Sequence, residues 1–178
     1  LARAGIAAKD ELVVLPSKEL GEQVWGISSL SVANGREGPE QKAELGTQVL
    51  LGHVVKIWKQ DRRWALIQTK DGYLSWAARS CFVRCSEQEA KAWENSPLLI
   101  VTAMEGQVVE APEASAQPVS DVVLGNLVKK TGESGEWYEV RLPDERKGFL
   151  PKKAAEDLAL WKQARKPENV SKRYSHKK

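Results

Sequence analysis

The sequence predicts an all-β protein built from two small β modules in tandem, each followed by a short helix. Three observations predict this class: the sequence repeats itself at a spacing of 73 residues, each repeat consists of short β-type runs separated by turn residues, and proline or capping residues bound one helical segment after each repeat. Short strands with turns roughly every 8 to 12 residues are typical of small barrels or sandwiches.

The repeat is evident from residues that coincide when the sequence is shifted by 73 positions. Identical residues coincide at many positions, among them Pro39, Glu40, Ala43, Val49, Leu51, Gly52, Lys56, Trp64 and Asp71, which fall on Pro112, Glu113, Ala116, Val122, Leu124, Gly125, Lys129, Trp137 and Asp144. Glycine, tryptophan and proline have backbone or packing roles that resist substitution. We therefore expect a first module over residues 26–85 and a second over residues 99–151.

The strands of each module are separated by recognisable turns. Thr47 to Lys59 is rich in Val, Leu and Ile and is divided by Gly52, and another β-type run begins at Trp64. Lys70-Asp71-Gly72 predicts a hairpin turn before a strand from Tyr73 to Ala77, because Asp-Gly between β-type runs is a strong hairpin signal. The second module repeats this order with strands over 122–130 and 137–142, a turn over 143–145 and a closing strand over 148–150.

A linker helix is expected over residues 86–98. Ser86 and Glu89 have the spacing of a capping box, in which each side chain satisfies an unpaired backbone amide of the other residue. Pro97 ends this segment, since a proline interrupts the interior of a helix. Trp93 lies near the end of the helix, where we expect it to pack the helix against the first module.

A C-terminal helix is expected over residues 152–166. Pro151 opens it and Pro167 closes it, because proline is tolerated at a first helical turn and excluded from an interior. Trp161 corresponds to the tryptophan of the linker helix. Residues 1–25 are expected to form an N-terminal extension with one strand over Glu11 to Leu15, and residues 167–178 form a basic tail.

The net charge of +3 is unevenly distributed. From Lys162 to Lys178, seven Lys or Arg residues oppose one acid, Glu168, which gives +6 and leaves −3 for residues 1–161. A nucleic-acid binder carries its positive charge on a folded face, so we expect no nucleic-acid partner. No apolar stretch approaches the ~20 residues that span a bilayer, so we expect no transmembrane segment.

The residues that usually carry catalysis or hold metals are scarce. Nucleophilic catalysis by Cys or Ser needs a nearby His base, but His176 lies in the polar tail and His53 lies in an apolar strand run. Cys81 and Cys85 are too few ligands for a tetrahedral zinc site, and they are either two free thiols or a disulfide across a helical turn. We therefore expect no enzyme activity, no metal site and no cofactor.

The abundance of tryptophan is the feature of the composition that most suggests ligand binding. The chain has seven Trp and two Phe residues, and Trp64, Tyr73 and Trp76 belong to adjacent predicted strands. Successive side chains of a strand face opposite sides, which favours an outward orientation for Tyr73. Exposed aromatic rings with a polar tip suit binding of peptides or sugars. Trp64 and Trp76 also fit a core role, and for Tyr73 a core role and a ligand-binding role both remain open.

A longer motif pattern runs through both modules. In the first it comprises Ser31-Val-Ala-Asn34, Arg36, Pro39, Ala43-Glu-Leu45, Thr47-Gln48, Leu51-Gly52, Val55-Lys56, Trp64, Ile67-Gln-Thr69, Asp71-Gly-Tyr73 and Trp76. In the second it comprises Val101-Thr-Ala103, Gln117-Pro-Val-Ser-Asp121, Gly125-Asn126-Leu127, Tyr138, Val140-Arg-Leu-Pro-Asp144, Gly148 and Pro151. In order and spacing, residues 25–174 closely resemble the two bacterial SH3-like domains of NlpC-type cell-wall cysteine peptidases.

This resemblance implies two small SH3-like barrels and a relation to peptidoglycan. In the family, a papain-like domain follows the barrels and cleaves the γ-D-glutamyl–diamino-acid bond of stem peptides with a Cys in an Asp-Cys-Ser-Gly-type motif and a His. Residues 168–174 resemble the beginning of that domain, but the sequence contains no such motif. The resemblance therefore implies a non-catalytic polypeptide that carries the stub of a missing catalytic domain.

The family also indicates which surface binds ligand. Its first barrel borders the active site, where the Tyr of Asp-Gly-Tyr and a Glu before the Pro hold the free amine of the substrate. Tyr73 matches that Tyr, whereas Gly38 occupies the Glu position and Glu37 lies one residue earlier. The expected ligand-binding residues of the first barrel are Tyr73, Asp71, Glu37, Arg36 and Trp64. Asp71 also fits a role in its turn, and Arg36 also fits a surface ion pair.

The function implied by the resemblance is a binding or positioning module of the cell envelope, periplasmic or extracellular. Its partners would be peptidoglycan stem peptides or a cell-wall enzyme. One alternative is a fragment of a γ-D-glutamyl-L-diamino-acid endopeptidase. Another is an SH3-like adaptor that binds proline-rich peptides, which would need an aromatic-lined groove. The sequence leaves the oligomeric state open.

Overall fold

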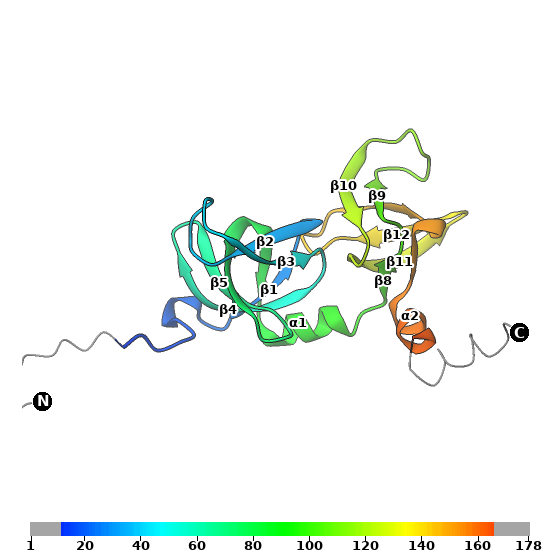
Figure 1. The fold of residues 1–178 in the computed structure, drawn as a ribbon. Coiled ribbons are helices and arrows are strands. Elements are labelled where there is room, and N and C mark those ends of the chain that lie inside the picture. Colours follow the sequence, from blue (N-terminus) through cyan, green and yellow to red (C-terminus); the bar gives the residue numbers. More distant parts are fainter. Residues whose placement is uncertain (1–11, 166–178) are drawn as a thin grey trace, which may run out of the picture.

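The computed structural model describes residues 12–165, which form two β modules one after the other with a helix along the junction (Figure 1). The described residues are mostly β, with two seven-stranded antiparallel sheets and two short α-helices. This confirms the predicted fold class of two SH3-like parts. Residues 1–11 and 166–178, which include His176 and the predicted basic tail over 167–178, lie outside the described residues.

The first module comprises strands β1 to β7 and helix α1. Its sheet has the order β3-β2-β6-β5-β4-β1-β7. The bounds are β1 Trp25–Ser28, β2 Val32–Arg36, β3 Leu45–Leu50, β4 Val54–Asp61, β5 Trp64–Gln68, β6 Leu74–Ala78, the 3-10 turn η3 Arg79–Cys81, β7 Phe82–Cys85 and α1 Glu87–Glu94. The strands expected over 47–59 and from Trp64 are thus β3, β4 and β5, and the Asp-Gly turn joins β5 to β6.

The second module comprises strands β8 to β14 and helix α2, in the equivalent sheet order β10-β9-β13-β12-β11-β8-β14. The bounds are β8 Leu98–Val101, β9 Glu105–Val109, β10 Pro118–Val123, β11 Leu127–Ser134, β12 Trp137–Arg141, β13 Lys147–Pro151, the 3-10 turn η4 Lys152–Ala154, β14 Ala155–Asp157 and α2 Leu158–Ala164. Each strand begins 73 residues after its counterpart, as Trp25 and Leu98 illustrate, so the sequence repeat is also a structural repeat.

Helix α1 begins as its capping residues predict. The Ser86 hydroxyl accepts a hydrogen bond from the Glu89 amide at 3.2 Å, and the Glu89 carboxylate accepts one from the Ser86 amide at 2.8 Å. Trp93 is buried, and its indole N–H donates to the Gly52 carbonyl at 2.8 Å. This tryptophan therefore fastens α1 to the β3–β4 turn.

Helix α2 differs from the prediction of a helix over 152–166. Residues 152–157 instead form η4 and β14, and the helix begins at Leu158 with Asp157 as its N-cap. The reason is long-range: β14 pairs with the edge of β8, with Ala155 opposite Val101. Pro151 ends β13 and does not open a helix, because the chain first completes the sheet.

The N-terminal segment also differs from the prediction. Residues 12–15 form no strand, because no neighbouring strand is positioned to pair with them. Residues 17–24 instead close over the first module, where Leu20 of the 3-10 turn η2 (Lys18–Leu20) is buried in its core. The Ser17 amide donates to the Trp58 carbonyl, and the Ile57 amide to the Val24 carbonyl, each at 2.8 Å.

The two modules pack head to tail through the turn between β3 and β4. Leu51 of this turn has no exposed surface and belongs to the buried core of the second module. The Leu51 carbonyl accepts a hydrogen bond from the Leu127 amide at 2.8 Å. Leu124, the repeat counterpart of Leu51, is 49% exposed. The junction is therefore heterologous, since the same turn is used differently in each module.

Polar groups complete the junction around this leucine. The buried Asn126 donates from its side-chain amide to the Ser31 carbonyl at 2.9 Å and accepts from the Val123 amide at 3.0 Å. The Nε2 atom of His53 lies 3.0 Å from the Gly125 carbonyl. The expectation of a strand histidine is thus wrong: His53 follows the β3–β4 turn, exposed, and contacts the second module.

At Gly52 the backbones of the two modules approach each other closely. The φ of this glycine is +78°, a conformation that L side chains rarely adopt. A Cβ atom there would lie 2.1 Å from the Leu127 carbonyl oxygen. Both the turn and the contact between modules therefore require glycine at this position.

Replacing Leu51 with alanine should destabilise the protein through the second module. The change leaves a cavity in a core to which the first module contributes this side chain, and we expect a loss of about 2–5 kcal/mol in the free energy of unfolding. Urea denaturation measures the loss, and amide hydrogen exchange assigns it to β8–β14. The matched control is Leu124→Ala, which should cost no more than about 0.5 kcal/mol. Equal losses in the two variants would contradict the head-to-tail packing.

Replacing Gly52 with alanine should separate the modules. The new Cβ atom would clash with the Leu127 backbone, in addition to the backbone strain of a positive φ. The control is Gly72→Ala, which has a φ of +91° and no atom within 4 Å of the new Cβ, so that only the strain of roughly 1–2 kcal/mol remains. Denaturation and limited proteolysis between β7 and β8 should show a larger effect for Gly52→Ala.

Candidate functional site

Asp71 and Tyr73 lie in the turn that joins β5 to β6. The Thr69 amide donates to the Tyr73 carbonyl at 3.0 Å, and the Asp71 carboxylate accepts from the Thr69 hydroxyl and, at 3.5 Å, from the Tyr73 amide. The Thr69 hydroxyl and then the Tyr73 amide lower the pKa of Asp71. Asp71 therefore shapes the turn that presents Tyr73.

The ring of Tyr73 lies against the backbone of β3 at Gly46. A Cβ atom on Gly46 would be 2.6 Å from the tyrosine hydroxyl oxygen, so only glycine permits this approach. Tyr73 is 44% exposed, and its neighbours Leu45 and Leu74 are 50% and 54% exposed. We call Tyr73, Gly46, Leu45 and Leu74 the Tyr73 surface: it includes an aromatic ring with a polar tip and two exposed aliphatic side chains from neighbouring positions.

A cavity of about 770 Å³ adjoins the same turn, between the first module and helix α2. Thr69 and Asp71 contribute to its lining, and Leu158 and Trp161 contribute from α2. The guanidinium group of Arg165 lies 4.1 Å from the centre of the Trp161 ring. The cavity thus brings the turn that carries Tyr73 close to a helix from the other module.

The remaining predicted site residues lie outside the β5–β6 turn, although Arg36 is next to the Tyr73 surface because it pairs with Leu45 across β2 and β3. Arg36 ends β2 and donates to the Ala43 carbonyl at 2.8 Å, which ties the β2–β3 loop. Glu37 is exposed at the start of that loop, and its amide donates to the Glu44 carbonyl at 3.0 Å. Trp64 is half-buried at the opposite end of β5 from the turn.

The strand register separates Trp64 from Tyr73. Trp64 pairs with Ala78, whereas Gln68, at the other end of β5, pairs with Leu74. At about 3.3 Å per residue, the two ends of β5 lie roughly 13 Å apart. The structure therefore places Tyr73 with Asp71 and puts Trp64 on a different part of the first module.

The second module has no equivalent of the Tyr73 surface. Arg146 stands at the Tyr73 position and Val119 at the Gly46 position. Arg146 donates to the Val119 carbonyl and pairs with Asp144 at 2.8 Å. Sequence reasoning overlooked Gly46, Leu45 and Leu74, although the repeat alignment carried a signal for them: their counterparts are Val119, Pro118 and Lys147.

The two thiols are both free and buried. Burial raises the pKa of Cys81, and burial together with the charge of Glu89 raises the pKa of Cys85 to about 11. Near neutral pH both thiols are therefore protonated, whereas the reactive form of cysteine is the thiolate. Among residues 12–165, no three His, Cys, Asp or Glu residues are grouped so that they could hold a metal ion.

Among residues 12–165, no helix is both long and apolar enough to cross a membrane.

Among sequence families, residues 35–80 match the bacterial dipeptidyl-peptidase Sh3 domain. This match begins in β2 and ends in the η3 turn, so it includes both Gly46 and Tyr73. No curated protein matches the chain significantly.

Two solved structures share the fold. An NlpC/P60 family protein from Bacillus cereus ATCC 10987 is 18% identical with a TM-score of 0.61, over 74% of this chain and 55% of that one. An NlpC/P60 endopeptidase from Photobacterium damselae subsp. piscicida is 14% identical with a TM-score of 0.55, over 81% and 35%. The chain thus spans about half or less of these proteins, matches a bacterial SH3 domain over residues 35–80, and has a fold found in NlpC/P60 family proteins.

Proposed function

We propose that this chain is a non-catalytic module of the cell envelope that binds or positions peptidoglycan stem peptides for cell-wall hydrolysis. The observation that carries the proposal is the Tyr73 surface, in which an exposed ring is held against Gly46 by a hydrogen-bonded turn. The fold shared with NlpC/P60 proteins supports the connection to cell-wall hydrolysis.

The surface suits a short peptide with polar and apolar parts. Leu45 and Leu74 offer aliphatic contacts, and the Tyr73 hydroxyl offers a hydrogen bond at the edge of the ring. The adjoining cavity is large enough to take a side chain or a sugar from the same ligand. Its lining includes Thr69 and Asp71, whose oxygens accept hydrogen bonds from amines and amides.

A second candidate is a part of a γ-D-glutamyl-L-diamino-acid endopeptidase. The observation that favours it is that the chain covers only 55% and 35% of the two NlpC/P60 proteins that share its fold. In that case the Tyr73 surface would form one wall of an active site completed by another domain. Hydrolysis of a stem peptide by the purified chain alone would contradict the non-catalytic proposal.

Replacing Tyr73 with alanine should weaken the binding of a muropeptide at least tenfold. The change removes the ring and its hydroxyl without touching the core, so the midpoint of thermal unfolding should stay within a few degrees. Gly46→Ala should weaken binding as well, because its Cβ atom displaces the ring. Intrinsic tryptophan fluorescence or calorimetry measures the affinity.

The matched control is Arg146→Ala, which alters the equivalent position of the second module. This variant should bind the muropeptide like the unmodified chain. A proline-rich peptide serves as the competing ligand, and tighter binding of that peptide would favour a general SH3-like adaptor. Absence of any muropeptide binding would overturn the proposal.

A further inference from the structure

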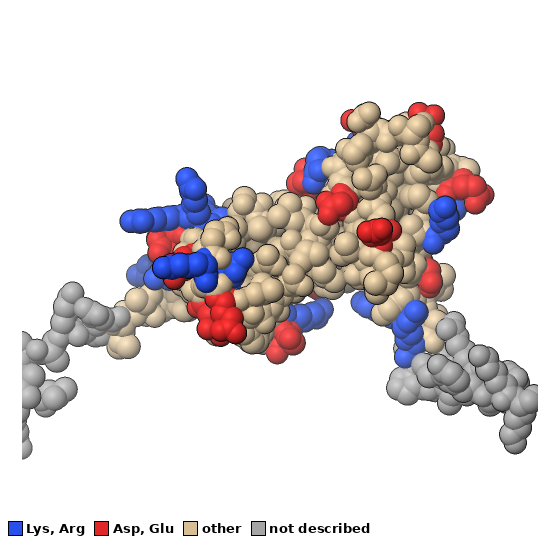
Figure 2. Space-filling view, turned by 45° about the horizontal axis from the view of Figure 1, so that its top comes forward, with Lys and Arg blue, Asp and Glu red and all other residues tan. Residues whose placement is uncertain are grey.

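A second hollow on the first module lies at the end of β5 that carries Trp64. Its volume is about 940 Å³, and its lining includes Arg62, Arg63, Arg79 and Arg84 around the Trp64 ring. We call this hollow the arginine groove. Figure 2 shows Lys and Arg side chains projecting from the end of the molecule formed by the first module.

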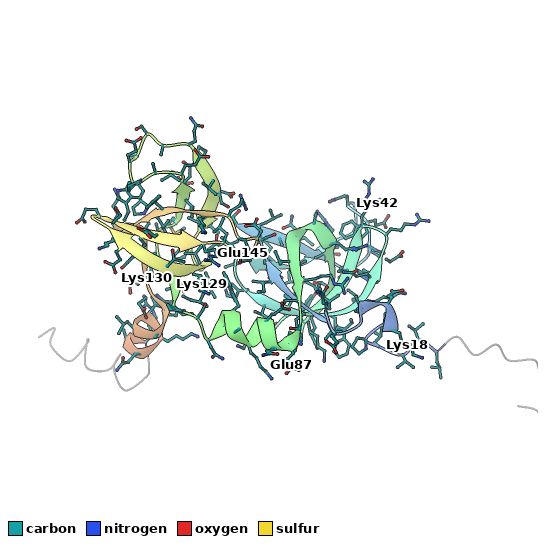
Figure 3. All side chains as sticks on the ribbon, turned by 180° about the vertical axis from the view of Figure 1, so that it is seen from behind. Lys18, Lys42, Glu87, Lys129, Lys130 and Glu145 are labelled. Carbon is teal, nitrogen blue, oxygen red and sulfur yellow. The ribbon has the colours of Figure 1, made fainter. Side chains whose placement is uncertain are left out.

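The positive charge of the arginine groove is not neutralised by nearby acids. Within residues 12–165, none of its four arginines forms a salt bridge. Arg79 donates to the Arg62 carbonyl and Arg84 to the Leu20 carbonyl, but a carbonyl cancels no formal charge. Glu40, the one acid in the lining, lies 3.6 Å from Lys42, which Figure 3 shows at the outer end of the first module.

The internal repeat shows that the fold does not require these arginines. The counterparts of Arg62, Arg63, Arg79 and Arg84 are Gly135, Glu136, Lys152 and Asp157, while Trp137 keeps the tryptophan. Positions 60–63, 79 and 84 of the first module carry a net charge of +3, from four Arg and Asp61. The equivalent positions of the second module carry a net charge of −2, from Lys152 together with Glu133, Glu136 and Asp157.

In the second module, Lys130 and Lys152 are paired with an acid, whereas the arginines of the arginine groove in the first module form no salt bridge among the described residues. Glu133 lies 2.5 Å from Lys152 and also pairs with Lys130, and these two hydrogen bonds lower its pKa to about 2. The position equivalent to Glu133 in the first module is Gln60, which has no charge. The same β-hairpin therefore carries a compensated cluster in one module and an uncompensated one in the other.

Arg62 also occupies a backbone conformation that does not suit it. Its φ is +47°, in the left-handed region, and its counterpart Gly135 has a φ of +54°. Glycine adopts this conformation without strain, whereas arginine does not. An arginine at a position where the other module has glycine is therefore not explained by the needs of the turn.

We propose that the arginine groove binds an acidic oligosaccharide, with a sugar ring against Trp64 and its carboxylate or phosphate groups on Arg62, Arg63 and Arg79. Guanidinium groups match both oxyanions with two parallel hydrogen bonds. A half-buried indole ring offers an apolar face with a polar edge, which suits a sugar. This site is separate from the Tyr73 surface and does not depend on the proposed function.

The test replaces two arginines of the arginine groove with the residues at the equivalent positions of the second module, and this double variant is called the transplant. Arg62→Gly with Arg63→Glu recreates the Gly135-Glu136 pair, so the hairpin should fold as it does in the second module. Binding of oligogalacturonate and of phosphorylated pentamannose to the full chain is measured by tryptophan fluorescence at 50 mM salt. The control, Lys147→Ala with Lys153→Glu, changes the charge of the second module by the same amount at exposed positions.

We expect one or both acidic sugars to bind, with the tighter one identifying the oxyanion, and neutral maltohexaose not to bind. The transplant should weaken binding at least tenfold and the control should not. Muropeptide binding should be the same in all three proteins, which keeps this test independent of the Tyr73 surface. The proposal fails if neither sugar binds, if the transplant binds as tightly as the unmodified chain, or if tripolyphosphate or a thymidine oligonucleotide binds as tightly as the acidic sugar.

Discussion

The insertion of Leu51 into the second module sets the relative position of everything else in the molecule. A closely packed core accepts a side chain in one arrangement, so this leucine holds the two modules together, and the Asn126–Ser31 and His53–Gly125 contacts help to hold their orientation. Gly52 lets the backbones meet, and its carbonyl receives the Trp93 indole N–H, which holds helix α1 along the junction. The cavity beside the β5–β6 turn exists because this junction brings α2 close to the first module.

A comparison of the two modules distinguishes residues that the fold requires from residues that are particular to the first module. Some residues shared by both modules are buried in the core, such as Val49 and Val122, and others lie in the turns at the junction, such as Gly52 and Gly125. Residues that differ at equivalent exposed positions are free of that requirement. Tyr73 and the arginines around Trp64 belong to this second group, which is why both proposed sites lie on the first module.

The two proposed sites lie at opposite ends of β5, in different chemical surroundings. The Tyr73 surface combines an aromatic ring with aliphatic side chains, and the turn that carries it uses the Asp71 carboxylate internally. The arginine groove keeps its charge open to solvent, where long-range attraction can gather an anionic ligand.

The sequence by itself determined the repeat, the strands that flank the Asp-Gly turn and their counterparts, and the capping box of α1, because turn and capping signals act over a few residues and the 73-residue spacing can be read directly from the sequence. It also indicated Tyr73 and Trp64 as candidate residues. Only the tertiary structure decided that 152–157 complete a sheet, that His53 contacts the other module, and that Tyr73 and Trp64 lie apart. These outcomes depend on strand pairing and packing between segments that are distant in the sequence. A local sequence pattern does not indicate which distant residue a given side chain will contact.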